Sequence, residues 1–326
     1  MTAIATAAPP RTFFGQPPAL GFLAFTEAWE RFSYYGMTSL LVLYMSQALF
    51  MPEHIGHIAG FAGYRGALES VFGPMSTLAL ASQTYGLYTG FVYFTPLIGG
   101  WIADRFIGRR NAVVAGALLM SGGHIAMAFD ASFLLALFLL ITGCGLLKGN
   151  ISTQVGQLYA EDDAAGRTRG FSIFSMAINV GAVAGPLTCG LLAQLYGWHV
   201  GFGVAGLLML FALATYLAGY RYLSETARGT ATIEPSAPLT VQQKRAIGAL
   251  IVVMLICIPH SIAFYQNSNI GFVWINGHVD RSVAGFQIPI AWFGSAMDSF
   301  ISIACVPFLF ALWRWQARHG GEPGEI

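Results

Sequence analysis

Long apolar runs dominate the sequence, and short polar segments separate them. Eight runs reach roughly the 20 residues that an α-helix needs to cross the hydrocarbon core of a bilayer. Backbone N–H and C=O groups in lipid need partners within their own segment, so each run is predicted to be a transmembrane helix. These helices are expected over residues 20–50, 78–101, 111–129, 132–155, 171–195, 200–222, 247–275 and 289–313.

The composition agrees with this pattern. Apolar residues make up 56% of the chain and charged residues only 10%, whereas a soluble domain carries about 25% charged residues. The net charge of +1 gives no clustered basic face of the kind that binds nucleic acid. The sequence therefore predicts an all-α polytopic membrane protein whose surroundings are the lipid bilayer.

Lysine and arginine are distributed unequally between the two sides of the predicted membrane segment. Twelve fall on one side and two, Arg65 and Arg281, on the other, with Arg31 and Lys148 inside helices. Positive residues mark the cytoplasmic side, so both ends of the chain are expected in the cytoplasm, with the protein in the plasma or inner membrane. The twelve are Arg11, Arg105, Arg109, Arg110, Arg167, Arg169, Arg221, Arg228, Lys244, Arg245, Arg314 and Arg318.

A polar stretch with two prolines separates six predicted helices from the last two. We predict a cytoplasmic leader over residues 1–19, a six-helix bundle over 20–222, a cytoplasmic linker over 223–246 and the start of a second bundle over 247–326. Six helices, a linker and further helices are the layout of the major facilitator superfamily, whose halves contain six helices each. The chain is thus expected to stop after the second helix of its second half, which would leave that bundle incomplete.

The first predicted helix carries Glu27, Glu30 and Arg31 inside its apolar run. Together with Tyr34 they occupy positions i, i+3, i+4 and i+7, which share one helix face. An ionised side chain near the bilayer centre costs about 2.5–3.5 kcal/mol even on lenient scales, so this face predicts a polar cavity or mutual pairing. A carboxylate there can bind and release a proton as its cationic partner moves. The alternative is a static salt bridge at the membrane boundary.

Two more polar residues lie inside predicted helices. Lys148 stands among glycines that permit close helix approach, and Glu27 or Glu30 is its expected partner. The alternative is a lysine that extends its side chain to the cytoplasmic interface. Asn179 is expected either to donate hydrogen bonds to a ligand or to join neighbouring helices.

The turn after the second predicted helix is strongly charged. It contains Asp104, Arg105 and Arg109. One interpretation is a topology anchor, because positive residues hold a loop on the cytoplasmic side. The other is a gate, in which Asp104 meets a basic residue or a helix end in one conformational state. The two roles are compatible.

Asp298 is a single acidic residue inside the eighth run. It is expected to carry a proton or to contact a cationic group. A local structural site with Ser295 and Ser299 is the alternative.

Enzyme chemistry finds no support in the sequence. No His-Glu zinc motif and no nucleophile elbow occurs, so a membrane-embedded hydrolase is not expected, and neither a metal nor a cofactor is predicted. The histidines are scattered: His54, His57, His124, His199, His260, His278 and His319.

Four motifs, in order along the chain, resemble signatures of the proton-dependent oligopeptide transporter (POT/PTR) family, a branch of the major facilitator superfamily. The first is EAWERFSYYG at 27–36, and GGWIADRFIGRR at 99–110 is similar to the family's loop signature. LKGNIS at 147–152 and the segment 171–181 resemble its fourth- and fifth-helix signatures.

This resemblance implies a symporter that imports di- and tripeptides, driven by protons and working by alternating access. It implies that the first-helix charges and the fourth-helix lysine couple proton movement to transport, and that aromatic and amide side chains contact the substrate. The implied coupling residues are Glu27, Glu30, Arg31 and Lys148. The implied substrate contacts are Tyr34, Tyr35, Tyr93 and Asn179.

The sequence departs from the family pattern at two places. Thr38 stands where the family often has a basic residue. Tyr265 and Gln266 stand in the seventh-helix stretch that usually carries a glutamate facing the peptide's amino group, and both are also expected to contact the substrate. A zwitterionic dipeptide would lose two charge-assisted hydrogen bonds, each worth about 1.5–3 kcal/mol. A proton-coupled carrier of another small solute, such as an amino acid, nitrate or a peptidomimetic, is therefore the alternative function.

Overall fold

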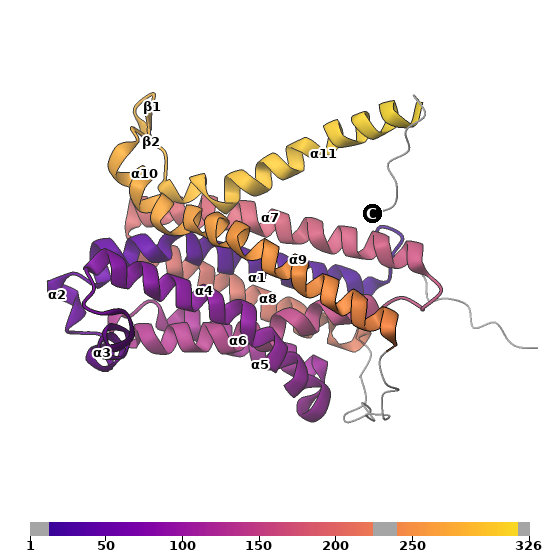
Figure 1. The fold of residues 1–326 in the computed structure, drawn as a ribbon, viewed down its shortest axis with the longest axis horizontal. Helices are drawn as coiled ribbons and strands as arrows, with labels where there is room; N and C mark the ends of the chain where they lie inside the picture. The colour runs from indigo at the N-terminus through magenta and orange to yellow at the C-terminus, as the bar shows by residue number, and fades with distance from the viewer. Residues whose placement is uncertain (1–12, 224–239, 319–326) are drawn as a thin grey trace, which may run out of the picture.

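A computed structural model describes residues 13–223 and 240–318 of the chain. Long helices run side by side through this part of the chain, and α11 diverges from the others along its length (Figure 1). Most of the predicted leader, the middle of the predicted linker and the last eight residues lie outside the described residues.

One long helix overlaps each of the eight predicted runs. The predicted ends differ from the observed ones by a few residues in most cases, because polar residues continue several helices beyond the apolar run. The long helices are α1 Pro18–Tyr44, α4 Thr77–Ile102, α5 Arg109–Ala126, α6 Phe133–Gln157, α7 Ala164–Tyr196, α8 Trp198–Gly219, α9 Val241–Gln266 and α11 Ser295–Arg318.

Short elements that the apolar pattern does not predict connect the long helices. A two-residue antiparallel ladder, with Ser282 opposite Gln287, closes the connection before α11. The short elements are the helices α2 Pro52–Ile55, α3 Phe61–Phe72 and α10 Phe272–His278, the strands β1 Ser282–Val283 and β2 Phe286–Gln287, the π-helical turns Met45–Leu49, Ala103–Ile107 and Asn267–Gly271, and the 3-10 turns Asp130–Ser132, Tyr220–Tyr222 and Ile290–Phe293.

Polar side chains fix the starts of three long helices. The Ser76 hydroxyl accepts a hydrogen bond from the Ala79 N–H at 3.2 Å, and Asp163 caps α7 in the same manner. Thr240 and Gln243 form a reciprocal capping box at the start of α9. These side chains satisfy backbone donors that have no partner within the helix.

The closest approach to α1 comes from α7, and two glycines of α7 make it possible. A Cβ atom at Gly181 would overlap the carbonyl oxygen of Ala28 and lie 2.8 Å from the Cβ of Arg31. A Cβ atom at Gly185 would overlap the carbonyl oxygen of Phe32. The two backbones therefore touch, as in other membrane helix pairs with small residues at the interface. This contact fixes the position of Arg31 in the bundle.

Asp130 joins three helix ends at one end of the bundle. The Tyr44 hydroxyl at the end of α1 donates a hydrogen bond of 2.6 Å to its Oδ1 atom. The His54 Nδ1 atom lies 3.1 Å from Oδ2, and the His199 Nε2 atom at the start of α8 lies 3.7 Å from Oδ1. From the turn before α6, one carboxylate thus links the end of α1, the short helix α2 and the start of α8.

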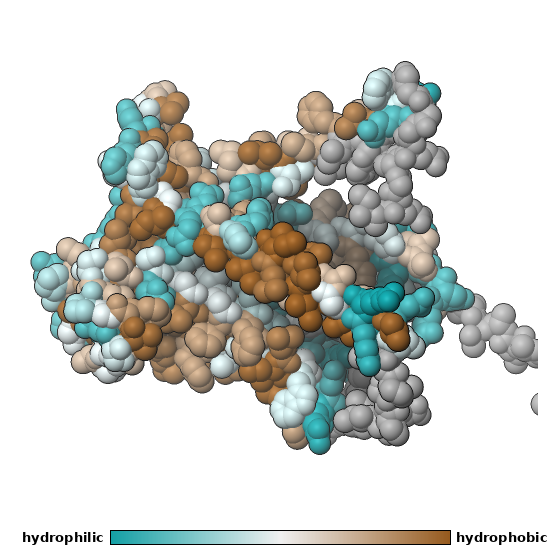
Figure 2. All heavy atoms as spheres, in the orientation of Figure 1, coloured by the Kyte–Doolittle hydropathy of each residue, from teal (hydrophilic) through white to brown (hydrophobic). Residues whose placement is uncertain are grey.

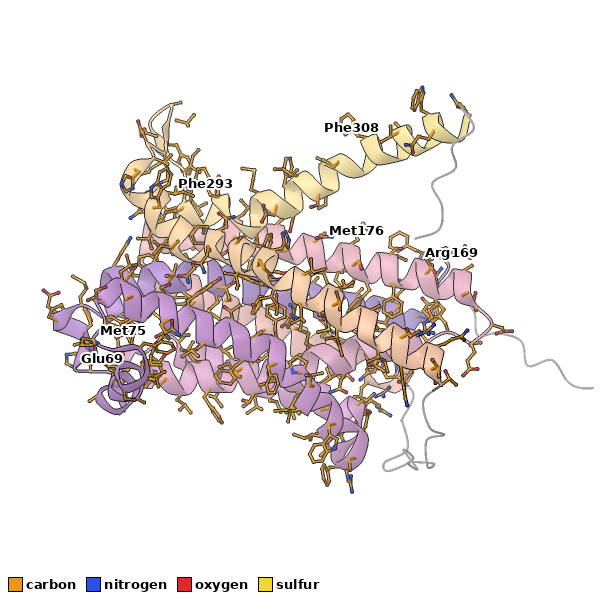
Figure 3. The ribbon with its side chains drawn as sticks, viewed as in Figure 1. Glu69, Met75, Arg169, Met176, Phe293 and Phe308 are labelled. Atoms are coloured by element: carbon orange, nitrogen blue, oxygen red, sulfur yellow. The ribbon has the colours of Figure 1, made fainter. Side chains whose placement is uncertain are left out.

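A second polar contact lies in the connection between α3 and α4, at the same end of the bundle. Figure 3 labels Glu69 and Met75 there, and it labels Arg169 of α7 at the opposite end of the bundle. The Glu69 carboxylate accepts hydrogen bonds from Arg65 Nε at 2.8 Å and from the Met75 N–H at 3.2 Å. These two donors hold the pKa of Glu69 below its ordinary value.

The outer surface is apolar along the helices. Figure 2 shows hydrophobic residues gathered over α9, and the described residues of α9 include no buried side chain. Among the described residues, four helical segments are long and apolar enough to cross a membrane by length and composition. They are Asp130–Gln157, Ala164–Tyr196, Trp198–Tyr222 and Val241–His278. The described part of the chain is almost entirely helical, as the sequence predicts.

Candidate functional site

The charges of α1 form one buried cluster, which we call the charged cluster: Glu27, Glu30 and Arg31. Each of the three residues is at most 3% exposed. The Arg31 Nε atom lies 3.1 Å from Glu27 Oε1 and also donates a hydrogen bond to Glu30 Oε2. The prediction of mutual pairing on one face of the first helix is therefore confirmed.

Polar atoms of the charged cluster remain available for further partners. Among the described residues, Glu27 Oε2, Glu30 Oε1 and Arg31 Nη2 are buried and have no hydrogen-bond partner. Buried polar atoms without partners are uncommon and costly, and they concentrate where a protein binds or moves something. Two carboxylates and one guanidinium carry a formal net charge of −1, so one added proton makes the cluster neutral.

Lys148 of α6 does not pair with these glutamates. In the described part of the chain the ion pairs of Glu27 and Glu30 are made with Arg31, and none joins either glutamate to Lys148. Instead, the Lys148 ammonium lies 4.0 Å from the centroid of the Tyr93 ring, within the range of a cation–π interaction. A direct contact of Lys148 with a glutamate stays a prediction, and the neighbour of the ammonium in this structure is the Tyr93 ring.

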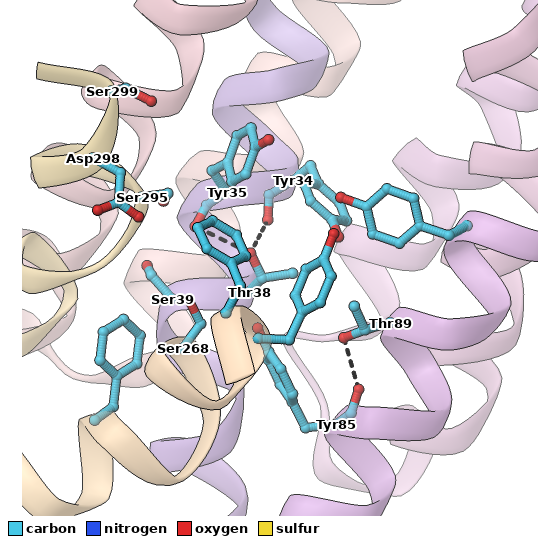
Figure 4. Close-up of a pocket in the computed structure, with 14 residues that line it drawn as sticks. Tyr34, Tyr35, Thr38, Ser39, Tyr85, Thr89, Ser268, Ser295, Asp298 and Ser299 are labelled. Carbon is cyan, nitrogen blue, oxygen red and sulfur yellow. Dashed lines mark hydrogen bonds between the residues drawn. The ribbon is translucent and has the colours of Figure 1, made fainter. Parts of the chain in front are cut away.

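A cavity of about 130 Å³ lies between α1, α4, α9 and the start of α11 (Figure 4). We call it the tyrosine cavity, because aromatic and hydroxyl-bearing side chains form most of its wall. Hydroxyl groups both donate and accept hydrogen bonds, so this wall suits a polar ligand with several amide or carboxyl groups. Its lining residues are Tyr34, Tyr35, Thr38, Ser39, Tyr85, Thr89, Tyr93, Phe264, Tyr265, Ser268, Phe272, Ser295, Asp298 and Ser299.

Two tyrosines connect the cavity with the cationic side chains of Arg31 and Lys148. The Arg31 guanidinium carbon lies 5.2 Å from the centroid of the Tyr34 ring, and Tyr34 lines the cavity. Tyr93 contacts Lys148 and also lines the cavity. The charged cluster and the cavity are therefore neighbours with shared walls.

Most of the predicted substrate contacts meet at the tyrosine cavity. Tyr34, Tyr35, Tyr93 and Tyr265 line it, and the Tyr93 and Tyr265 ring centroids are 5.7 Å apart. Gln266 instead lines an adjoining groove of about 610 Å³ between α4 and α9, which shares Tyr93 and Tyr265 with the cavity.

In the described part of the chain, Asn179 lines neither the tyrosine cavity nor the adjoining groove. It donates a hydrogen bond of 3.2 Å to the carbonyl oxygen of Ser175, one turn earlier on α7. Thr38 lines the cavity, and its hydroxyl donates to the Tyr34 carbonyl oxygen at 2.9 Å.

Sequence reasoning missed one wall of the cavity. Tyr85 and Thr89 of α4 line it together with Tyr93, each four residues from the next. This spacing places all three on one face of the helix. The repeat of polar side chains inside an apolar run was the signal that could have found them.

The charged turn after α4 forms a local ion pair. Arg109 Nε lies 2.8 Å from Asp104 Oδ1, and the π-helical turn Ala103–Ile107 brings the two together. For Arg105, no ion pair is found among the described residues. The predicted gating residues are therefore partly engaged with one another.

Comparison with known proteins identifies the family. The sequence profile of the POT family matches residues 110–237. A di-/tripeptide transporter of Lactococcus lactis subsp. cremoris is 37% identical over 289 residues, which cover 87% of this chain and 53% of the relative. The chain belongs to the POT family. It spans about half the length of this relative.

Solved structures of POT proteins share the fold. A peptide transporter POT in complex with sulfate has a TM-score of 0.70 and 29% identity, over 97% of this chain and 72% of that one. A POT family transporter in complex with 5-aminolevulinic acid has a TM-score of 0.67 and 25% identity, over 95% and 71% of the two chains. The peptide transporter YePEPT of Yersinia enterocolitica is 29% identical, over 97% of this chain and 71% of the relative. These POT relatives are membrane transporters and not enzymes.

Proposed function

We propose that this POT chain belongs to a proton-coupled symporter that imports di- and tripeptides or peptide-like solutes by alternating access. Two relatives are named di-/tripeptide transporters, which supports the substrate class. The observation that carries the proposal is the contact of the charged cluster with the wall of the tyrosine cavity.

The charge balance of the cluster supports proton coupling. Glu27, Glu30 and Arg31 together carry one more negative than positive charge and are buried. A net charge in a low-dielectric interior is unfavourable, so the cluster gains from one bound proton. When Arg31 changes partners during a conformational change, the affinity for that proton changes as well.

The shared walls support coupling of that proton to the substrate. A ligand in the cavity contacts Tyr34 and Tyr93, and these rings contact Arg31 and Lys148. In this proposal Lys148 belongs to the coupling set through Tyr93. The substrate is bound directly by Tyr34, Tyr35, Tyr93 and Tyr265. Longer substrates, or the substrate in another conformation of the protein, are also contacted by Gln266 and Asn179.

The proposal also includes the orientation of the chain in the membrane and the position of the gate. Basic residues such as Arg109 and Arg169 favour the cytoplasm for their end of the bundle. The Asp104–Arg109 pair lies there and would exchange partners as the gate opens. Residues 20–222 then form one bundle and residues 247–326 begin the second, with both ends of the chain in the cytoplasm.

Carriage of another small solute is the second candidate. The cavity has Thr38 where the family often has a basic residue, and neither Tyr265 of the cavity nor Gln266 of the adjoining groove is a carboxylate. One POT family transporter has been captured with 5-aminolevulinic acid, which is an amino acid and not a peptide.

Binding to the chain in lipid nanodiscs tests the proposal. We expect dialanine to bind, and to bind more tightly at pH 6 than at pH 8, while Glu30→Gln loses this pH dependence. Ser70→Ala, a change in an exposed hydroxyl of α3, is the matched control. In proteoliposomes, an inward proton gradient should drive dialanine uptake. Binding of amino acids or nitrate without any binding of dialanine or trialanine would overturn the peptide assignment. Identical pH dependence in Glu30→Gln and wild type would contradict proton coupling.

A further inference from the structure

The short helix α2 lies at one end of the bundle, between two points where the connection from α1 to α4 is anchored (Figure 1). Phe50 precedes α2 and is 1% exposed, and Ile58 follows it and is 5% exposed. The Ala59 N–H also donates a hydrogen bond of 3.1 Å to the Ala131 carbonyl oxygen. The residues of α2 itself are exposed, except for the half-buried Ile55. Docking of α2 therefore depends on few contacts, and one polar contact can shift it.

That polar contact joins His54 of α2 to Asp130. The His54 Nδ1 atom lies 3.1 Å from Oδ2 of the carboxylate, which is hydrogen-bond distance. The Tyr44 hydroxyl donates to the other oxygen, and a phenol keeps its proton across the physiological pH range. A histidine side chain, in contrast, changes its charge between pH 5 and 8. The His54 contact thus varies with pH, while the bond from Tyr44 holds the carboxylate in place.

One further titratable side chain reaches this carboxylate. The His199 Nε2 atom lies 3.7 Å from Oδ1, beyond hydrogen-bond distance, so His199 is the weaker of the two histidine partners. The other titratable groups on the surrounding elements form neither a hydrogen bond nor an ion pair with Asp130 within the described residues. They are Glu53, His57, Arg65, Glu69 and the buried His124.

We propose that protonation of His54 clamps α2 onto Asp130, so that acid docks the connection between α1 and α4 and alkali loosens it. A hydrogen bond between two charged groups is roughly twice as strong as a neutral one. The two side chains are 51% and 23% exposed, so water screens the pair and the effect is modest. In the proposed orientation this end faces away from the cytoplasm, and the clamp then responds to the pH outside the cell.

Backbone amide exchange of α2 tests the clamp in lipid nanodiscs, where both faces of the chain meet the same buffer. His54→Gln is compared with wild type at each pH, so that the intrinsic pH dependence of exchange cancels. At pH 5.5 we expect amides 53–58 to exchange about two- to fivefold faster in the variant, the range of one exposed ion pair. At pH 8 the two chains should differ little, because a neutral imidazole has no charge to lose.

Four further variants define the partners. His54→Arg carries a permanent positive charge and should keep slow exchange at both pH values. Asp130→Asn removes the opposite charge but keeps an oxygen acceptor for Tyr44, and it should resemble His54→Gln at pH 5.5. His57→Gln is the matched control, because it removes an exposed imidazole of the same connection outside the clamp. His199→Gln should retain the acid-dependent protection of α2.

Equal exchange in His54→Gln and wild type at pH 5.5 overturns the clamp. The same ratio at pH 5.5 and pH 8 overturns it too, because the contact would then be independent of charge. Loss of the acid protection in His57→Gln, with His54→Gln unaffected, would move the pH response to another histidine and reject the proposal. Wild-type exchange in Asp130→Asn at pH 5.5 would exclude this carboxylate as the partner. None of these measurements requires transport, so failure of the proposed peptide function leaves the clamp testable.

Discussion

The Lys148 ammonium lies over the face of the Tyr93 ring, 4.0 Å from its centroid. Tyr93 also forms part of the cavity wall, so this cation contacts the ligand space through one aromatic ring. A double-mutant cycle with Lys148→Met and Tyr93→Leu should give a coupling of about 0.5–2 kcal/mol in the free energy of unfolding. Tyr93→Phe keeps the ring and should preserve most of it. Additive effects of the two changes would exclude a cation–π contact.

Removal of the guanidinium from the charged cluster should be costly. Arg31→Gln leaves Glu27 and Glu30 buried side by side without a cation, and loss of one partner of a buried pair costs about 3–5 kcal/mol. Thermal unfolding in detergent measures this. The triple change Arg31→Gln, Glu27→Gln and Glu30→Gln should recover much of the loss, because no uncompensated charge remains. A triple variant less stable than Arg31→Gln would show that the carboxylates stabilise the fold without Arg31 and would contradict this charge argument.

Close contact between α1 and α7 predicts a strong steric effect at one glycine. In Gly181→Ala, the new Cβ atom overlaps the Ala28 carbonyl oxygen, so the helices must separate and the melting temperature should fall. Gly203→Ala in α8 is the control, because a Cβ atom there meets no heavy atom within 4 Å. Alanine in an open helical position should stabilise by about 0.5–1 kcal/mol. Equal melting temperatures for the two variants would contradict the backbone contact.

The α3–α4 connection should depend on pH through Glu69. Its pKa is held low by the bonds from Arg65 and Met75, so the stabilising contribution is present at neutral pH. It is lost as the pH falls through the lowered pKa, below the ordinary glutamate value of about 4.3. Glu69→Gln should therefore melt earlier than wild type at pH 7, and the difference should shrink at the acidic end of a melting series. A difference that grows on acidification would reverse the sign of this effect.

The sequence predicts the structure best where the residues of one segment determine the structure of that segment by themselves. The apolar runs predict the eight long helices, because hydrocarbon leaves the backbone no alternative. The i, i+3, i+4 spacing places Glu27, Glu30 and Arg31 together, because these positions share one face of a helix. The short helix α3 has no comparable signal, since it is only 12 residues long and its sequence is interrupted by Arg65, Glu69 and Ser70.

Contacts between helices could not be predicted from spacing alone. The pairing of Arg31 with Glu27 and Glu30 lies within α1, whereas the neighbour of Lys148, which lies on α6, depends on how the helices pack. Asn179 lies on a helix that contacts α1 through its glycines, and its side chain bonds within its own helix. Periodicity defines a helix face, whereas the neighbour of that face depends on the whole bundle.

The glycine contact of α7 also determines the rotational setting of α1. One residue corresponds to about 100° of rotation around a helix axis. If α1 turned by that amount, the carboxylates would leave the interior and the Tyr34 ring would leave the cavity wall. Because Gly181 brings the α7 backbone against Ala28 and Arg31 of α1, such a rotation would also break the close contact between the two helices.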